Sequence, residues 1–182
     1  MADKQADVGR EMLTSAIATG ESLKRLAERA SEQVADADLH KALDAHTNSI
    51  AVITKHLAGN MRSRWTNFLT EDGEKPWRQR DDEFVDGGAS RDELLANWQS
   101  GWRCFFDALR RLAPDDLTRT VHVRGHPQTA AGAIIGQLAH YGQHVGQILL
   151  IARVLAGDSW SVLTIPRGPG ESERYNRRTW KE

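Results

Sequence analysis

Four long stretches of this 182-residue chain place apolar residues three or four positions apart. That spacing gathers apolar side chains on one face of a helix, so each stretch predicts an amphipathic α-helix with one buried side. The predicted helices cover about residues 5–33, 47–69, 90–113 and 129–156. Such helices bury their apolar faces against one another, which favours an all-α four-helix bundle; the alternative is an irregular helical array.

The predicted helix ends carry residues suited to them. Thr47 or Asn48 can cap the start of the second helix. Ser90-Arg-Asp-Glu93 is a capping box at the start of the third, and Pro114 ends that helix. Gly157 stands just past the fourth helix, where a left-handed residue is favoured. We interpret four aromatic residues of the third helix as core or dimer interface: Trp98, Trp102, Phe105 and Phe106.

The segments between the helices differ in character. Residues 70–84 are charged, contain turn formers and show no period, which predicts a long connection. Residues 118–127 alternate briefly and predict a short hairpin or an extended crossing. Residues 158–182 are rich in Ser, Gly, Pro and Arg and predict an irregular tail packed on the helices. The length suits one domain with a real core, so we expect a single domain over residues 1–182.

Composition disfavours several classes of protein. The chain has 24 Lys and Arg against 25 Asp and Glu and no long basic run, so we expect no nucleic-acid partner. It has neither the roughly 20 consecutive apolar residues of a membrane span nor a secretory signal. Its single cysteine, Cys104, excludes an internal disulfide and suits a reducing compartment. We therefore expect a cytoplasmic protein without a membrane partner, and Cys104 as a buried small hydrophobe rather than a nucleophile.

His140 and His144 stand out among the seven histidines. Four residues apart on a helix, two imidazoles lie on one face with their Cβ atoms about 6 Å apart, and one metal ion can bridge them. The pair lacks the glutamate of the zinc-protease helix, since Tyr141 follows the first histidine, so a metallopeptidase is disfavoured. Both histidines lie at the edge of the apolar stripe, where bundles build metal sites. The spacing alone also fits two ordinary histidines.

A third imidazole would complete a facial site with positions open to water or substrate. His56 lies at the edge of the apolar stripe of the second predicted helix, with Asn60 one turn further along. The alternative for His56 is a partly buried histidine bonded to a backbone carbonyl. Spacing alone does not choose His56 over His46 or His126.

Several motifs resemble the DinB/YfiT-like superfamily of bacterial metalloproteins. Two of them, Ile53–Trp65 and Gln137–Ile148, are similar to the superfamily in general, and each contains histidines of the predicted site. Two others, Phe68–Phe84 and Leu163–Gly168, resemble one uncharacterised branch of it. The resemblance covers most of the chain. It implies a four-helix bundle, often dimeric, in which one histidine of the second helix and a His-x-x-x-His pair of the fourth bind a divalent metal. By position these ligands are His56, His140 and His144.

The resemblance also implies a class of activity. Characterised members include S-transferases and isomerases that use bacillithiol or mycothiol, and some hydrolase-like members. It therefore implies a homodimeric, metal-dependent thiol S-transferase acting on small electrophiles, with a low-molecular-weight thiol as its second cofactor. The alternative is a non-catalytic metal-binding stress or interaction protein. Imidazole ligands suit zinc, nickel, copper or iron, and a site of three neutral imidazoles can lower the pKa of a bound thiol or water.

Charged side chains after the second helix offer a further hypothesis. Arg64, Arg78 or Arg80 would lie over the metal and bind a carboxylate of the thiol or substrate. The alternative is that residues 70–84 form a solvated, salt-bridged loop. Asn60 and Gln137 are interpreted as polar rim residues beside the site; the alternative is that they orient a ligand or a water molecule. No catalytic residue is assigned from the sequence.

Overall fold

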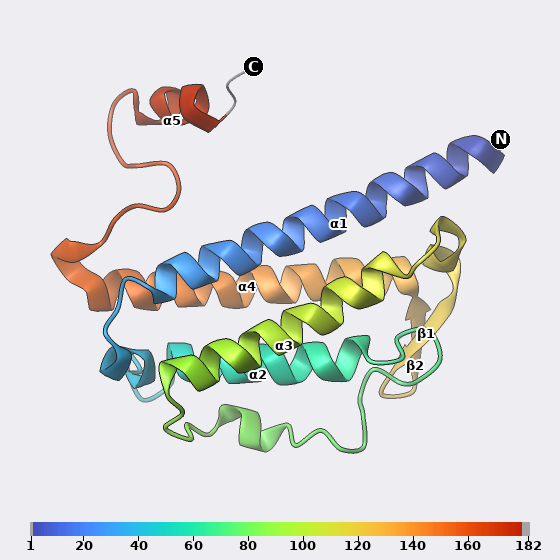
Figure 1. The fold of residues 1–182 in the computed structure, drawn as a ribbon, viewed down its shortest axis with the longest axis horizontal. Coiled ribbons are helices and arrows are strands. Elements are labelled where there is room, and N and C mark those ends of the chain that lie inside the picture. The colour runs from blue at the N-terminus through green and yellow to red at the C-terminus, as the bar shows by residue number, and fades with distance from the viewer. Residues whose placement is uncertain (1, 180–182) are drawn as a thin grey trace.

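The structure is a computed structural model that describes residues 2–179, and it is mainly helical (Figure 1). Within that range the four longest helices follow the four apolar stretches of the sequence. The α-helices are α1 (Ala2–Ser31), α2 (Ile50–Trp65), α3 (Arg91–Arg110), α4 (Ala130–Ala156) and α5 (Glu171–Thr179). The 3-10 helices are η1 (Asp36–His40), η2 (Asp81–Phe84), η3 (Pro114–Thr118) and η4 (Gly157–Ser159). The strands are β1 (Thr120–Val123) and β2 (His126–Thr129).

The four long helices pack in pairs. Helix α2 lies along α3 and α1 lies along α4, while α2 also faces α4 and α1 touches α3 (Figure 1). Strands β1 and β2 form an antiparallel hairpin beside the start of α4, and they confirm the short hairpin expected over residues 118–127. Among the described residues, no helix combines the length and the apolarity that crossing a membrane requires.

Aromatic side chains of α3 fill the core. Trp102 and Phe105 are fully buried, and each ring lies edge-on to the ring of Tyr141 from α4, at centroid distances of 5.6 and 5.8 Å. A Cβ at Gly101 of α3 would lie 2.8 Å from the Ala58 Cα of α2. Glycine therefore lets these two helix backbones approach more closely than any other residue would. The four aromatic residues of the predicted third helix are all core residues.

Two predicted helix ends are confirmed. Ser90 Oγ accepts the N–H of Glu93, and the Glu93 carboxylate accepts the N–H of Ser90, so the capping box is formed at α3. Gly157 follows α4 as its C-cap with a φ of 54° and a ψ of −127°, a positive-φ conformation that glycine adopts without strain but that lies outside the left-handed helical region.

The predicted limits of the second helix are wrong at both ends. Ser49, not Thr47 or Asn48, caps α2, with its Oγ accepting the N–H of Val52. Thr47 Oγ1 instead accepts the N–H groups of Leu43 and Asp44 in the preceding turn. The helix ends at Trp65 rather than near residue 69, because the chain turns at Asn67 with a φ of 50°.

Two segments expected to be irregular contain short helices. Residues 70–84 end in η2, and the predicted irregular tail contains α5. Gly168 and Gly170 precede α5 with positive φ values, and Glu171 pairs with Arg174 at 2.9 Å within its first turn. Helix α5 is polar, so apolar periodicity gave no signal for it. Figure 1 shows α5 set apart from the four long helices.

Candidate metal centre

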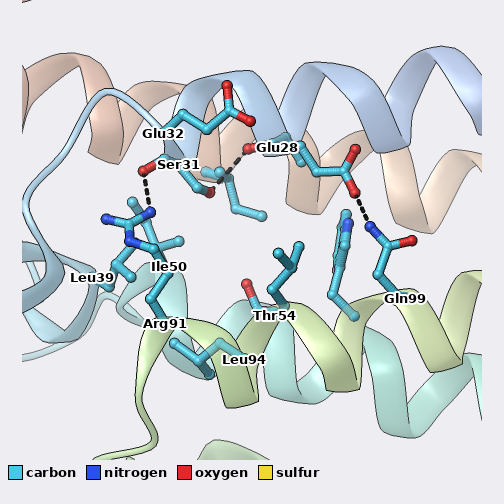
Figure 2. A pocket seen from close by; sticks show the side chains of 13 residues that line it. Glu28, Ser31, Glu32, Leu39, Ile50, Thr54, Arg91, Leu94 and Gln99 are labelled. Carbon is cyan, nitrogen blue, oxygen red and sulfur yellow. Dashed lines mark hydrogen bonds between the residues drawn. The ribbon is translucent and has the colours of Figure 1, made fainter.

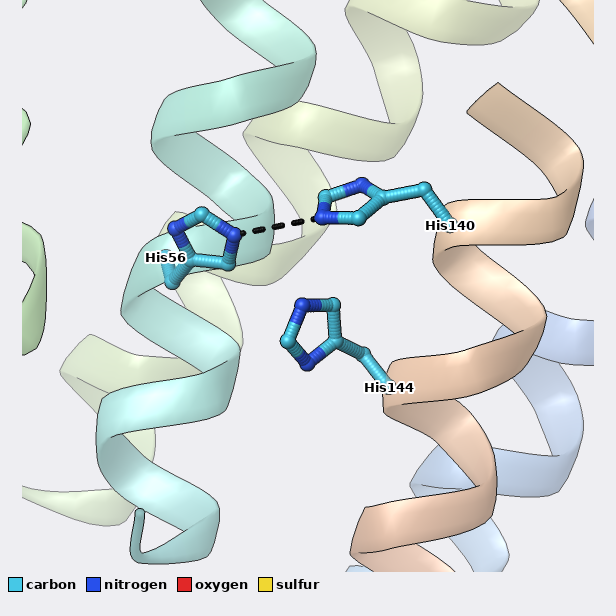
Figure 3. A group of neighbouring side chains, drawn as sticks. All are labelled: His56, His140 and His144. Carbon is cyan, nitrogen blue, oxygen red and sulfur yellow. Dashed lines mark hydrogen bonds between the residues drawn. The ribbon is translucent and has the colours of Figure 1, made fainter. Parts of the chain in front are cut away.

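Three imidazoles meet between α2 and α4. Ring nitrogens of His56, His140 and His144 all lie within 4.8 Å of one another (Figure 3). The Nε2 atoms of His56 and His140 are 3.4 Å apart. Two imidazole nitrogens bound to one ion at about 2.0–2.1 Å in tetrahedral geometry lie roughly 3.3 Å apart. The donor atoms and their separation therefore fit a divalent metal ion.

Burial differs across the group. His56 is buried on α2, while His140 and His144 are half-buried, one turn apart on α4. The three side chains come from two facing helices, α2 and α4 (Figure 3). Helical bundles commonly build metal sites in this way. The group is therefore closed on the α2 side and partly open to solvent on the α4 side.

The ring of His56 is oriented by a buried carboxylate. His56 Nδ1 lies 3.0 Å from Glu83 Oε2 of η2. Arg78 donates to both Glu83 oxygens, from Nε and Nη2, each at 2.8 Å. Burial alone would raise the pKa of Glu83, but the hydrogen bonds from Arg78 and His56 outweigh it and hold that pKa below its usual value. A carboxylate only accepts, so Nδ1 of His56 carries the proton and Nε2 presents a lone pair to the other two rings.

A glycine makes room for this carboxylate. A Cβ at Gly59 of α2 would overlap the Glu83 side chain at Oε1. The ring of His56 also packs on Phe84, with centroids 4.6 Å apart. Residues after α2 therefore return to cover the helix next to His56 and fix its ring.

The two histidines of α4 are neutral at physiological pH. Burial, followed by the charges of His144 and His56, lowers the pKa of His140 to about 4. Burial also lowers the pKa of His144, although a hydrogen bond to Gln147 opposes it. His144 Nδ1 lies 2.8 Å from Gln147 Oε1, which accepts, so Nε2 of His144 is free to bind a metal. Neutral imidazole is the form that coordinates metal ions.

The polar residues near the site are less exposed than the sequence suggested. Asn60, interpreted as a rim residue, is buried, and its Oδ1 accepts the hydroxyl of Tyr141 at 3.3 Å. Tyr141 in turn accepts the indole N–H of Trp65 at 2.7 Å. The interpretation of Asn60 was wrong because Tyr141 needs a buried acceptor. Gln137 is half-buried with its Oε1 atom enclosed.

The charged connection after α2 is partly buried, which corrects the prediction of a solvated loop over residues 70–84. Lys75, Arg78 and Glu83 are all buried, because their charges are paired with one another or with neighbouring groups. Arg78 reaches the histidines through Glu83, Arg64 is buried on α2, and Arg80 is half-buried at the start of η2.

The remaining candidates lie elsewhere. His46 is exposed in the turn before α2, and His126 is exposed on the hairpin with His122. Among the described residues, the histidines that could share one ion are His56, His140 and His144. Cys104 is half-buried and burial raises its pKa, so its thiol is not activated. Sequence reasoning missed Glu83, because nothing in the spacing of the loop marks one carboxylate among several.

A cavity of about 280 Å³ lies away from the three histidines, between α1, α2 and α3 (Figure 2). Its polar side chains largely bind one another or the backbone: Arg91 donates to the carbonyl oxygens of Ser31 and Val34, and Gln99 donates to Glu28. None of the three clustered histidines lines it.

Comparison with known proteins gives one match. A family model described as "Protein of unknown function (DUF1572)" matches residues 7–169. No curated protein and no solved structure matches the chain.

Proposed function

The chain belongs to the DUF1572 family, and we propose that it is a DinB-like four-helix-bundle protein that binds a divalent metal and catalyses thiol transfer to small electrophiles. One observation carries the proposal: three imidazoles from two helices lie within 4.8 Å of one another, and one of them is oriented by a buried carboxylate. A histidine held in this way by an outer carboxylate is typical of metal sites.

Each residue of the site would have a separate role in metal binding. His56, His140 and His144 would hold the ion through nitrogen atoms that burial keeps neutral on α4 and that Glu83 aims on α2. A bound zinc, nickel or iron ion would lower the pKa of a thiol at its open positions, so that thiolate is present at neutral pH. In the reaction the thiol sulfur forms a bond to carbon, the leaving group departs with its electron pair, and the thiol proton goes to solvent.

A homodimer accompanies this proposal. Helix α4 exposes three large aliphatic side chains: Ile135, Leu150 and Val154. Exposed aliphatic groups on one helix face favour self-association, because pairing removes them from water. Sedimentation at micromolar concentration measures the mass, and a monomer at every concentration would contradict this part of the proposal.

The test combines metal binding with turnover. Calorimetric titration of the wild type with zinc, nickel or iron should show one site per chain, and His144→Ala should weaken it at least a hundredfold. The matched control is His122→Ala, an exposed histidine on the hairpin, which should bind as the wild type does. The metal-loaded wild type should then accelerate substitution of 1-chloro-2,4-dinitrobenzene by bacillithiol, mycothiol or cysteine.

The outcomes separate the two functions. Tight metal binding without turnover for any thiol and metal would favour the non-catalytic metal-binding protein. Absence of metal binding by the wild type would refute both.

A further inference from the structure

A small cavity continues the seam between α2 and α4 beyond the histidines. It measures about 70 Å³ and lies under the loop after α2 and the β1–β2 hairpin. Four polar residues line it: Arg64 of α2, Gln137 of α4, and the exposed His122 and Gln128 of the hairpin. Its other walls are mostly apolar and include Trp65, Phe68, Val121 and Ala133.

The cavity lies close to the candidate metal centre along both helices. Gln137 precedes His140 by three residues on α4, and Arg64 follows His56 by eight residues on α2. At about 1.5 Å per residue these offsets correspond to roughly 5 and 12 Å along the helix axes. Gln137 therefore lies within one helical turn of His140, an offset that a molecule of a few bonds can span.

Arg64 is buried but incompletely paired. Its residue is 8% exposed, and its Nε and Nη1 atoms have no hydrogen-bond partner among the described residues. Its nearest carboxylate is Glu74, 3.6 Å from Nη2. The same Glu74 oxygen also serves Arg78 and Arg124, each at 3.4 Å. Buried guanidinium donors without acceptors are costly, so this site favours a ligand that brings acceptors.

The side chain of Gln137 also has a buried polar atom without a hydrogen-bond partner. Its Oε1 atom is buried and has no partner among the described residues. The amide can turn either its oxygen or its NH₂ group toward a ligand, because the two ends are nearly equal in size. The cavity therefore offers hydrogen-bonding groups from both helices.

The loop over Arg64 is built to hold the guanidinium in place. A Cβ at Gly73 would lie 3.1 Å from Arg64 Nη1, so a larger residue would press on the guanidinium. The carbonyl oxygen of Gly73 accepts a hydrogen bond from the hydroxyl of Ser63 at 2.8 Å. The N–H of Gly73 donates to the carbonyl oxygen of His122, also at 2.8 Å. Asp72 accepts the N–H groups of Arg124 and Gly125 at 2.8 Å each. The loop that lies over Arg64 is thus fixed by hydrogen bonds to α2 and to the hairpin.

We propose that Arg64 and Gln137 bind a carboxylate of the thiol substrate whose sulfur lies at the three histidines. This inference rests on the proposed function for the metal end of the site. A cavity of about 70 Å³ accepts a planar carboxylate but not a whole substrate. Burial of Arg64 strengthens a charge-assisted hydrogen bond from its guanidinium. The substrate class is therefore a thiol carrying a carboxylate a few bonds from its sulfur.

Two matched series of thiols test this. Cobalt-loaded protein is titrated with mercaptoacetate, 3-mercaptopropionate and 4-mercaptobutyrate, and with the neutral mercaptoalcohols of the same lengths. Binding is followed by the sulfur-to-cobalt absorption band. For at least one chain length the carboxylate should bind ten times more tightly than its neutral partner. Arg64→Gln should abolish this preference by weakening the carboxylate thiols to the level of their neutral partners.

The control is Arg124→Gln, because Arg124 is exposed and shares the same Glu74, and this variant should keep the preference. If Arg64→Gln does not fold, Gln137→Leu takes its place and should reduce the preference at least threefold. Equal binding of both series at every length overturns the inference. So does a preference that survives Arg64→Gln or, where that variant does not fold, Gln137→Leu.

Failure of the metal site would be seen separately, as the absence of cobalt binding or of the sulfur band. In that case metal-free protein is heated in sodium propionate and in sodium chloride of equal ionic strength. Propionate should raise the melting temperature of the wild type but not of Arg64→Gln, or of Gln137→Leu where Arg64→Gln does not fold. Equal melting temperatures of the wild type in the two salts would refute the carboxylate site.

Discussion

Helix α2 has two long neighbours, and its contacts with them differ in kind. Toward α3 the backbones come close at Gly101 and Ala58, and the space beside them is filled by aromatic rings. Toward α4 the helix presents His56, Asn60 and Arg64, and polar side chains of α4 face them. The contact between α2 and α3, the apolar seam, stabilises the fold through apolar burial. The contact between α2 and α4, the polar seam, holds polar groups in fixed positions.

The comparison shows how one helix serves both purposes. Fourteen of the sixteen residues of α2 are buried, so its polar residues are as enclosed as its apolar ones. Enclosed polar groups are tolerated because most of them are paired, as Asn60 is with Tyr141 and His56 with Glu83. Six buried polar side-chain atoms have no partner among the described residues: four lie between α2 and α4, on Arg64, Gln137 and His140, and two are the indole nitrogens of Trp98 and Trp102 on α3. The polar seam therefore carries most of the unpaired buried groups.

The largest expected effect is on the apolar seam. Trp102→Ala removes a fully buried indole and should lower the free energy of unfolding by about 3–5 kcal/mol. Metal affinity of the folded fraction should stay within about twofold of the wild type, since Trp102 does not touch the histidines. Urea denaturation and calorimetric titration measure the two quantities. A parallel loss of metal affinity would show that the seams are not independent.

The next effect is on the polar seam. Glu83→Gln removes the charge that fixes the Nδ1 proton of His56, and metal affinity should fall about 10- to 100-fold. Asp86→Asn is the control. Asp86 Oδ1 lies 2.9 Å from Nδ1 of His40, so it pairs with a histidine in the same way, but it is not part of the site. Calorimetry with zinc should show no change for the control. Equal affinity of Glu83→Gln and the wild type would mean that Glu83 has only a structural role.

The smallest expected effect concerns Asp72, in the loop after α2 that covers the polar seam. Backbone N–H groups of Glu74, Gly125 and Arg124 lower the pKa of Asp72 to about 2. The charged carboxylate therefore stabilises the fold above its ordinary pKa near 3.8, and this stability is lost as the pH falls from there through about 2. Asp72→Asn should lower the melting temperature by about 2–4 °C at pH 7.

The pH profile supplies the control for that prediction. The difference in melting temperature between the wild type and Asp72→Asn should be constant above pH 5 and should shrink toward pH 2. A difference independent of pH over that range would show that the charge of Asp72 contributes nothing.

Apolar periodicity predicted the four long helices and placed His140 and His144 on one face, because both follow from the geometry of a single helix. The choice of His56 depends on how α2 docks on α4, and only the resemblance to a family selected it. The start of α2 was misplaced because Thr47, Asn48 and Ser49 can all cap a helix, and the backbone path decides among them.

The roles of Glu83 and Arg64 could not be predicted for a related reason. Local sequence does not show that the charged segment after α2 folds back on that helix. Its charges resemble those of a solvated loop until the paired burial of Arg78 with Glu83 is known. The cavity beside Arg64 needs α2, α4, the loop and the hairpin together, so no single motif marks it.

The order of the three histidines along the chain has a consequence for biosynthesis. Glu83 follows His56 by 27 residues, whereas His140 follows it by 84. The ribosome therefore delivers the first imidazole and its orienting carboxylate long before the other two. One imidazole holds a metal ion only weakly, so a nascent chain cannot retain an ion at this site until α4 has emerged and docked. Metal capture would thus be among the last steps in the maturation of this protein.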